Sequence, residues 1–256
     1  MSIFTLGLFS CASSSEETIK DNDFQVQLQS YKPKNLKQDK KILLILPPTG
    51  GMNFIDKSYA RRFARAGIKT KILKNWTNDN EQNIELSIHT RFYKRAQRAI
   101  DLVLEKYPDH DFWLLGTSVG GLHGSITTAR QPQVKKALFI VAGADIASIL
   151  VNSTQEALQT LKKLRFEKYK YINDEEYLQA LRAVMPYEVQ KLDIPKGKLL
   201  GLIISENDKV VPTKNQLLLE QLWNAKRVST PNHGHTPSVV YTWLFNSNKV
   251  KNFFLK

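Results

Sequence analysis

Residues 111–121 of this 256-residue chain read Asp-Phe-Trp-Leu-Leu-Gly-Thr-Ser-Val-Gly-Gly. The apolar run Phe112–Leu115 is typical of a buried strand in a parallel sheet. The segment that follows, Ser118–Arg130, is predicted to be a helix. Ser118 therefore stands at a sharp turn between a strand and a helix, which is the context that gives the pattern Gly-x-Ser-x-Gly a chemical meaning.

The turn itself favours a nucleophilic serine. It would hold Ser118 in a strained backbone conformation, with Oγ projecting above the sheet. Gly116 and Gly120 would let neighbouring backbone pack closely. The N-terminus of the helix supplies a positive potential near any developing oxyanion. The same five-residue pattern also occurs in ordinary turns. The prediction that Ser118 is a nucleophile therefore depends on the predicted strand before it and the predicted helix after it.

Strands and helices alternate through most of the chain, which predicts an α/β fold with a mostly parallel central sheet and helices on both faces. The alternating pattern of Phe24–Leu28 suits an outer antiparallel strand. The other predicted strands are Ile42–Leu46, Ile68–Leu73, Phe112–Leu115, Ala137–Val141, Leu199–Ile204 and Arg227–Ser229. The other predicted helices are Lys57–Ala66, Glu85–Tyr107, Lys214–Trp223 and Ser238–Phe245.

One stretch interrupts this alternation. From Asp145 to Pro186 the pattern is mainly helical and contains no strand. We expect a helical cap insertion over about residues 146–186, lying over one edge of the sheet. Its long and aromatic side chains would partly cover the core and partly line a pocket.

The residues that a serine nucleophile needs appear downstream. A serine requires a base that is held in turn by an acid. Asp208 lies just past the predicted strand Leu199–Ile204, and His233 and His235 lie between the last predicted strand and the last long helix. These positions share the rim on which open α/β sheets place their sites.

On these motifs the chain resembles the α/β-hydrolase superfamily, from about Ile42 to the C-terminus. The motifs are Gly116–Gly120, the loop Asp208–Pro212 and the pair Gly234-His235. The resemblance implies the α/β-hydrolase fold, with Ser118 as nucleophile, Asp208 as acid and His235 as base.

Two of these assignments have alternatives. His233 is the alternative base, although the family pattern of Gly followed by His favours His235. Some family members carry the acid after the preceding strand, where Asp145 stands, but Asp145 is also well placed to cap the helix that begins at Ile146.

The oxyanion hole needs two backbone N–H donors. The resemblance implies Val119 for the first and the loop after Ile42–Leu46 for the second. Many relatives have His-Gly where this chain has Pro47-Pro48. Because Pro48 has no N–H, the second donor is expected to be Thr49 or Gly50.

The cysteine count and the spacing of other residues exclude several kinds of site. The single cysteine excludes an internal disulfide framework and a cysteine-based zinc site. The histidines lack ligand spacing, so no metal site is predicted. Gly116–Gly121 lacks the lysine of a phosphate-binding loop. No cofactor is expected.

The net charge of +13 comes from 37 Lys and Arg against 24 Asp and Glu. It leaves attraction to an anionic membrane surface open. The cluster Lys162–Lys170 interleaves Phe166 and Tyr169 like a stacking surface for single strands. A solvated helix face with its aromatic side chains turned inward explains that cluster better, so no nucleic-acid partner is expected.

The N-terminal residues resemble a bacterial lipoprotein signal, because the short apolar run Met1–Ser10 leads directly to Cys11. Lipidation of Cys11 would place the protein in the cell envelope or periplasm, anchored to the membrane. A frayed terminus on a cytoplasmic protein is the alternative. Residues 1–23 are expected to form the signal-like segment and a polar tether, and residues 24–256 the hydrolase domain.

The function expected from the resemblance is a serine hydrolase. It would cleave an ester or related acyl bond of a small molecule through an acyl-enzyme intermediate. Thioesterase, peptidase and acyltransferase activities use the same residues and stay open. The alternative is a non-catalytic, envelope-associated binding protein on the same scaffold.

Overall fold

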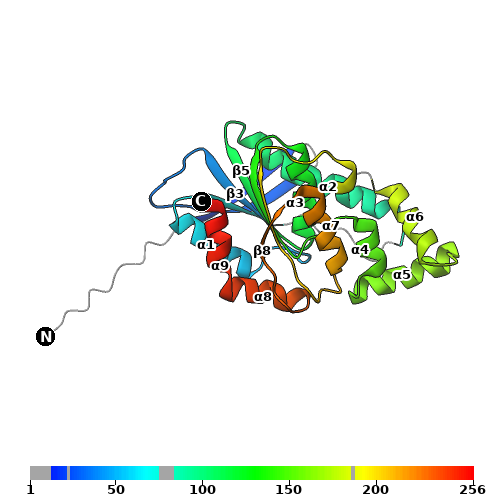
Figure 1. Cartoon of the computed structure of the whole chain (residues 1–256). Helices are drawn as coiled ribbons and strands as arrows, with labels where there is room; N and C mark the ends of the chain where they lie inside the picture. The colour runs from blue at the N-terminus through cyan, green and yellow to red at the C-terminus, as the bar shows by residue number, and fades with distance from the viewer. Residues whose placement is uncertain (1–12, 22–23, 75–83, 186–187) are drawn as a thin grey trace.

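The computed structural model describes residues 13–21, 24–74, 84–185 and 188–256. Its centre is an eight-stranded sheet of order β1-β2-β4-β3-β5-β6-β7-β8 (Figure 1). Strands β3 to β8 are parallel to one another, and β1 and β2 run antiparallel to their neighbours. The strands are β1 (Ser13–Asp21), β2 (Phe24–Lys32), β3 (Lys41–Leu46), β4 (Lys69–Leu73), β5 (Asp111–Thr117), β6 (Val134–Ile140), β7 (Leu199–Ile203) and β8 (Lys226–Ser229).

Helices cover both faces of the sheet, as the alternating pattern predicted. They are α1 (Phe54–Arg65), α2 (Ser87–Lys106), α3 (Val119–Arg130), α4 (Ile146–Asn152), α5 (Glu156–Tyr169), α6 (Asp174–Val184), α7 (Thr213–Trp223), α8 (His235–Phe245) and α9 (Ser247–Leu255), with a short 3-10 helix at Val189–Lys191. None of the helices in the described part of the chain is long and apolar enough to cross a bilayer.

Alternate side chains of β3 enter two separate cores. Leu44 and Leu46 pack with residues of α2, α3 and α7 on one face. Leu43 and Ile45 pack with residues of α1 and α9 on the other. A strand buried on both faces must be apolar at every position, which is why the unbroken apolar run predicted it.

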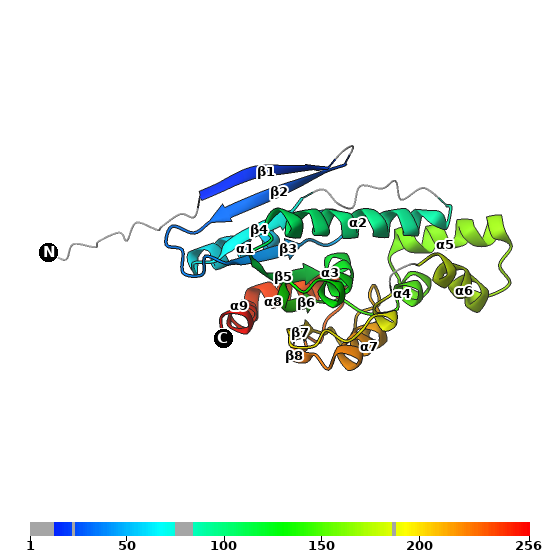
Figure 2. The ribbon, with the colours of Figure 1, turned by 90° about the horizontal axis from the view of Figure 1, so that it is seen from above.

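The N-terminal strands correct two predictions. Ser13–Asp21 is not a tether: it forms β1, which pairs with β2 along its whole length. The predicted strand Phe24–Leu28 extends to Lys32 and lies between β1 and β4, so β1 and not β2 is the outer strand (Figure 2). The signal-like segment and Cys11 lie outside the described residues.

A cluster of charges holds β1 against the sheet. The carboxylate of Glu17 receives hydrogen bonds from Nζ of Lys71 at 2.5 Å and from the hydroxyl of Tyr107 at 2.6 Å. Nζ of Lys106 lies 2.9 Å from the same carboxylate. Burial alone would raise the pKa of Glu17, but these donors together outweigh it and lower the pKa to about 2.

The cap consists of α4, α5 and α6, which lie together beyond one end of the sheet in both ribbon views (Figures 1 and 2). It contacts the start of α2. Thr90 donates a hydrogen bond to the carbonyl of Val184 at 2.5 Å, and Lys168 and Tyr169 bind the carboxylate of Glu85. The insertion therefore packs on α2 instead of standing apart as a second domain.

Candidate active site

Ser118 lies at the turn between β5 and α3 in a strained backbone conformation. Its φ of 52° and ψ of −120° fall in the region that side chains other than glycine rarely adopt. Its N–H donates to the carbonyl of Ile140 at 2.9 Å, which fixes the turn to the neighbouring strand. A Cβ added to Gly120 would lie 2.1 Å from the carbonyl oxygen of Leu46, so the turn fits against β3 only with glycine there.

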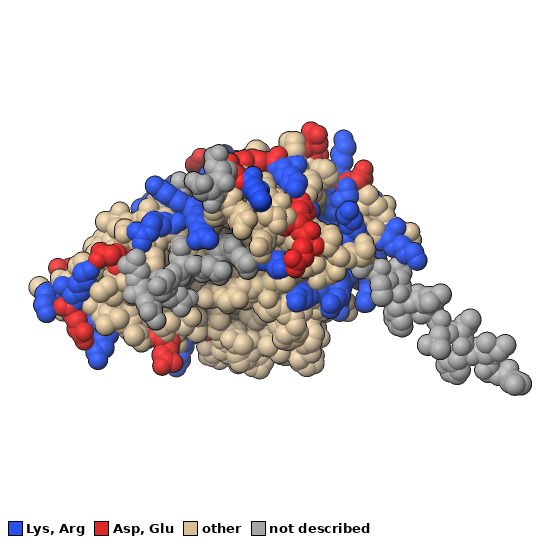
Figure 3. Space-filling view, turned by 180° about the vertical axis from the view of Figure 1, so that it is seen from behind, with Lys and Arg blue, Asp and Glu red and all other residues tan. Residues whose placement is uncertain are grey.

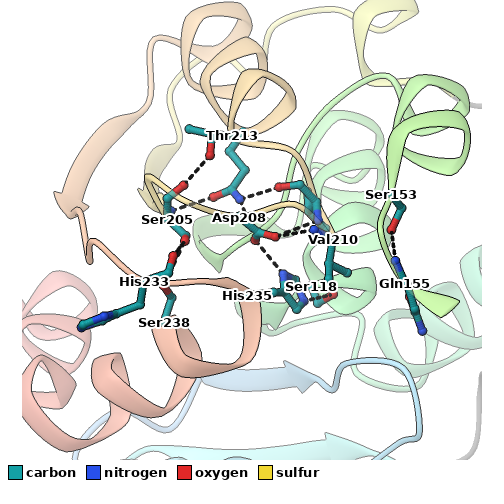
Figure 4. Close-up of polar contacts among 12 residues, drawn as sticks. Ser118, Ser153, Gln155, Ser205, Asp208, Val210, Thr213, His233, His235 and Ser238 are labelled. Carbon is teal, nitrogen blue, oxygen red and sulfur yellow. Dashed lines mark hydrogen bonds and ion pairs between the residues drawn. The ribbon is translucent and has the colours of Figure 1, made fainter.

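Ser118, His235 and Asp208 are joined by two hydrogen bonds (Figure 4). The distance from Nε2 of His235 to Oγ of Ser118 is 2.9 Å. The distance from Nδ1 of His235 to Oδ2 of Asp208 is 2.6 Å. The three residues come from three separate connections of the sheet: Ser118 follows β5, Asp208 follows β7, and His235 opens α8.

The carboxylate of Asp208 is fully buried and held by further donors. Its Oδ1 accepts the backbone N–H groups of Val210 at 2.8 Å and Val211 at 2.9 Å. Its Oδ2 accepts Nε2 of Gln216 at 2.9 Å, in addition to the bond from His235. Gln216 was missed from the sequence, where nothing distinguishes it from the other polar residues of α7.

His233, the alternative base, points away from this arrangement (Figure 4). Its exposed ring lies 5.0 Å from the ring of Tyr241, measured between centroids. Its carbonyl oxygen accepts a hydrogen bond from Oγ of Ser205 at 2.5 Å, which fixes the loop that leads to His235.

Asp145, the alternative acid, has a different set of partners. Its Oδ1 caps α4 by accepting the N–H of Ser148 at 3.1 Å. Its Oδ2 accepts Nη2 of Arg182 in the cap at 2.7 Å. The backbone φ of 58° at Asp145 is left-handed, which aspartate tolerates better than most residues. These contacts make Asp145 a cap of α4 and a link to α6.

An apolar pocket opens beside Ser118. The core side contributes residues of α2 and α3, and the cap side contributes residues of α4 and α5. Its apolar lining includes Ile88, Phe92, Leu122, Ile149, Leu150, Leu158, Leu161, Val210 and Val211. The cap side chains thus divide as predicted: Leu158 and Leu161 of α5 line this pocket, whereas Tyr177 and Leu181 of α6 are buried in the core.

Two histidines line the same pocket. His123 is buried against the ring edges of Phe92 and Tyr93, and burial lowers its pKa to about 3. Burial, and after it the positive charge of Arg165, lowers the pKa of His89 to about 3. Both rings are therefore neutral at physiological pH.

Arg165 is a fully buried guanidinium of the cap helix α5. Its Nη1 donates to Nε2 of His89 at 2.7 Å and to the hydroxyl of Tyr177 at 2.9 Å. Its Nε donates to the carbonyl of Ile84 at 3.0 Å. Since arginine can only donate, Nε2 of His89 accepts and its proton is on Nδ1. The contact between Arg165 and His89 was not predicted, because the two residues lie 76 positions apart in the sequence.

The loop after β3 lies at the same site. Residues Pro48 to Gly51 form a tight turn, in which the N–H of Gly51 donates to the carbonyl of Pro48 at 3.1 Å. Gly50 has a φ of 91°, as the third residue of a type II turn requires. Thr49 and Val119 line the pocket beside Ser118, and an added Cβ on Gly50 would meet no atom within 4 Å.

Two further predictions concern other ligands. The described ranges contain no group of three or more His, Cys, Asp or Glu residues that could hold a metal ion. In the basic cluster Lys162–Lys170, the ring of Phe166 turns inward to pack edge-on against Tyr177 and Tyr171. The hydroxyl of Tyr169 donates to Glu85.

Several solved structures are similar to this chain. It matches Est1E from Butyrivibrio proteoclasticus with a TM-score of 0.69 at 14% identity, over 95% of this chain and 98% of that one. It matches the acylaminoacyl peptidase of Pyrococcus horikoshii with a TM-score of 0.68 at 14% identity. That match covers 96% of this chain but only 41% of the peptidase. For mouse alpha/beta hydrolase domain-containing protein 10 the TM-score is 0.61 at 13% identity, over 93% of this chain and 99% of that one.

The chain therefore has the α/β-hydrolase fold, as its motifs predicted. No protein-family model matches the sequence, and no curated protein is similar to it in sequence. At such low identities the likeness supports the fold, and the chemistry must be argued from the site.

Proposed function

We propose that this protein is a serine hydrolase that cleaves an ester or a related acyl bond through an acyl-enzyme intermediate. The observation that carries the proposal is the pair of hydrogen bonds of 2.9 Å and 2.6 Å that join Ser118, His235 and Asp208. In this arrangement the hydroxyl of Ser118 can give its proton to the imidazole of His235, which the carboxylate of Asp208 holds in place. Backbone strain at Ser118 supports the proposal, because such strain is common at active sites.

In the first half of the reaction, Oγ of Ser118 attacks the carbonyl carbon and its proton passes to Nε2 of His235. The carboxylate of Asp208 holds Nδ1–H and stabilises the imidazolium that forms. The imidazolium then gives its proton to the leaving oxygen as the bond between that oxygen and the carbonyl carbon breaks. The acyl group is left on Ser118.

In the second half, water attacks the acyl carbon and gives a proton to Nε2 of His235. Oγ of Ser118 departs and takes that proton back, so the enzyme returns to its starting state. In both halves the negative charge on the carbonyl oxygen needs backbone donors. We assign the N–H of Val119 as one donor. Thr49 lines the pocket, which favours its N–H over that of Gly50 as the second.

The pocket supports an apolar acyl group as the substrate part bound next to Ser118. Leucine, isoleucine, valine and phenylalanine dominate its lining, and its histidines are neutral. An apolar acyl chain would gain free energy by leaving water there. An ionised acyl chain would lose its hydration without a charged partner on the lining.

The test is labelling with a fluorophosphonate probe, which reacts with activated serines. Wild-type protein should be labelled, Ser118→Ala should not, and Ser15→Ala, which removes an exposed serine of β1, should be labelled like wild type. A series of p-nitrophenyl esters should then show higher kcat/KM for apolar acyl groups than for succinyl, which is charged. Absence of labelling in folded protein would instead favour a non-catalytic binding protein.

A further inference from the structure

An aromatic surface lies on α8 and the first residue of α1. Phe54 is 61% exposed, Leu244 53% and Phe245 69%, which is unusual for side chains of this size. Tyr241 and Trp243 belong to the same helix as Leu244 and Phe245, and their side chains are partly exposed. The eleven residues of α8 include no Asp, Glu, Lys or Arg. We call Phe54, Tyr241, Trp243, Leu244 and Phe245 the aromatic face.

The aromatic face is held together by its own contacts. The rings of Phe54 and Trp243 meet edge-on with 5.2 Å between centroids, which joins α1 to α8. The rings of Tyr241 and Phe245 are 4.9 Å apart. Nε1 of Trp243 donates to Oγ of Ser58 at 2.9 Å. Side chains fixed in this way lose little further freedom when a partner covers them.

A cationic groove adjoins the aromatic face. It lies between α1 and α9 and is lined by Ser58, Arg61, Arg62, Arg65, Ala66 and Lys251. Ser58 belongs to this lining and also binds Trp243, so the groove and the aromatic face are continuous. The lining contains cations and no carboxylate, and Arg62 bonds to the neutral amide of Asn248.

The figures place the two regions on one side of the molecule. Figure 1 shows α8 along the lower edge, with α9 and α1 above it. In the opposite view of Figure 3, a broad stretch of the lower edge carries no charged side chain, and basic and acidic side chains lie above it.

We propose that the aromatic face and the cationic groove dock this protein on the surface of a lipid bilayer that contains anionic phospholipid. Aromatic rings and leucine favour the boundary between headgroups and acyl chains. The arginines and Lys251 would meet the lipid phosphates beside it. This inference concerns a partner surface and does not depend on the proposed hydrolysis.

Charge decides between a bilayer and a second copy of the chain. In a symmetric dimer through the aromatic face, the same patch meets itself. Neither α8 nor the lining of the cationic groove contains a carboxylate, so such a dimer would offer the arginines and Lys251 no opposite charge within the patch. An anionic bilayer instead offers opposite charge at the groove and apolar volume at the rings.

The docking surface shares elements with the candidate active site. Helix α8 begins at His235, and Phe54 follows the loop that carries Thr49 and Gly50. Docking through this surface would therefore keep the candidate active site close to the bilayer.

The experiment is co-sedimentation of the full chain with vesicles of phosphatidylcholine, with or without phosphatidylglycerol. Cys11→Ser is present throughout, so that no lipid attached there contributes to binding. We expect binding to vesicles in which about a third of the lipid is phosphatidylglycerol, and at least about tenfold weaker binding to pure phosphatidylcholine. Leu244→Ser with Phe245→Ser should weaken binding to the anionic vesicles by at least about tenfold.

Matched variants separate the two parts of the surface. Ile172→Ser with Ile194→Ser removes two other exposed apolar side chains, 87% and 58% exposed, that lie outside the aromatic face, and should leave binding unchanged. Arg61→Glu with Arg65→Glu should weaken binding to the anionic vesicles by at least about tenfold, and Lys163→Glu with Lys226→Glu should weaken it much less.

Three results would overturn the proposal. The first is no binding of folded protein to anionic vesicles. The second is equal loss in the Ile172 and Ile194 control and in the Leu244 and Phe245 variant. The third is a dimer, seen by sedimentation velocity, that Leu244→Ser with Phe245→Ser converts to a monomer while vesicle binding is unaffected.

Discussion

Nε2 of Gln216 lies 2.9 Å from Oδ2 of Asp208, the same oxygen that receives a hydrogen bond from His235. Gln216 is fully buried, and its Oε1 accepts the N–H of Ser205 at 2.9 Å. This amide therefore braces the loop that carries Asp208, and the hydroxyl of Ser205 links that loop to the carbonyl of His233 in the loop that carries His235.

Gln216→Met should lower kcat with little change in KM, by roughly tenfold to a hundredfold. Without the donor, the carboxylate of Asp208 loses one of the hydrogen bonds that fix it, so it orients the ring of His235 less firmly. The steady-state ester assay measures kcat and KM, and an unchanged kcat would show that Gln216 only fills space.

Asp208→Asn should affect catalysis, whereas Asp145→Asn should affect stability. Asp208→Asn should lower kcat on the order of 10⁴-fold while the protein stays folded, because the amide favours the wrong tautomer of His235. Asp145→Asn should instead lower the melting temperature, because it removes the charge that pairs with Arg182, whereas asparagine caps a helix about as well as aspartate. Thermal melts beside the ester assay compare the two, and an inactive, stable Asp145→Asn would reverse the assignment of the acid.

The sequence predicted the strands of the parallel sheet to within a few residues. Ile42–Leu46, for example, became Lys41–Leu46 in the structure. A parallel strand covered on both faces needs an unbroken apolar run, so a local pattern is sufficient to find it. The meeting of Ser118, Asp208 and His235 was expected for a related reason, because each follows a strand end or opens a helix on one rim.

Strand β1 shows where local pattern fails. Only Ile19 is buried in Ser13–Asp21, and most of its other side chains are exposed. The strand depends on pairing with β2 and on contacts of Glu17 with Lys71 and Tyr107, which lie far along the chain. Gln216 and Arg165 were missed for the same reason, since their partners are set by tertiary packing.

Arg165→Met should destabilise the protein by roughly 2–4 kcal/mol, because it removes the donor to several buried acceptors. It should also raise the pKa of His89 above its value of about 3, since the charge of Arg165 lowers it. Burial, the larger cause, persists, so the pKa should stay below the ordinary value of 6.5. Chemical denaturation and an NMR titration of the histidine measure the two effects.

Lys163→Met, on the exposed face of the same helix, is the matched control for Arg165→Met. It should change neither the denaturation midpoint nor the titration of His89. If Arg165→Met is as stable as this control, the contacts of the guanidinium with α2 contribute nothing to cap docking.

Stability should fall in acid as Glu17 is protonated. Its pKa is lowered from 4.5 to about 2 in the folded state, so the stabilisation is complete above about 4.5 and is lost as pH falls toward about 2. Allowing for solvent screening, we expect a contribution on the order of 1–2 kcal/mol at neutral pH. Glu17→Gln should remove it, and the difference from wild type should shrink between pH 4.5 and pH 2.

Glu16→Gln serves as the comparison for Glu17→Gln, because the Glu16 carboxylate is 72% exposed beside Lys74. Urea denaturation at several pH values should show little effect of this change. A difference between Glu17→Gln and wild type that does not depend on pH would assign the loss to packing of β1 and not to the charge of Glu17.

Gly120 and Gly234, which lie close in sequence to Ser118 and His235, should respond differently to a methyl group. In Gly120→Ala the new Cβ would lie 2.1 Å from the carbonyl oxygen of Leu46 and 2.5 Å from that of Pro47. The backbone of Leu46 and Pro47 cannot move aside without moving the loop that carries Thr49. We expect kcat to fall by roughly a hundredfold, the scale of a displaced oxyanion donor.

Gly234→Ala should be tolerated, although Gly234 directly precedes His235. Its φ of −72° suits any residue, and an added Cβ would meet no atom within 4 Å. Its kcat/KM should stay within about threefold of wild type, since surface changes of this kind have small effects on stability. Steady-state assays of both variants compare them. Equal losses in Gly120→Ala and Gly234→Ala would mean that close contact with the β3 loop does not set the requirement for glycine in the Ser118 turn.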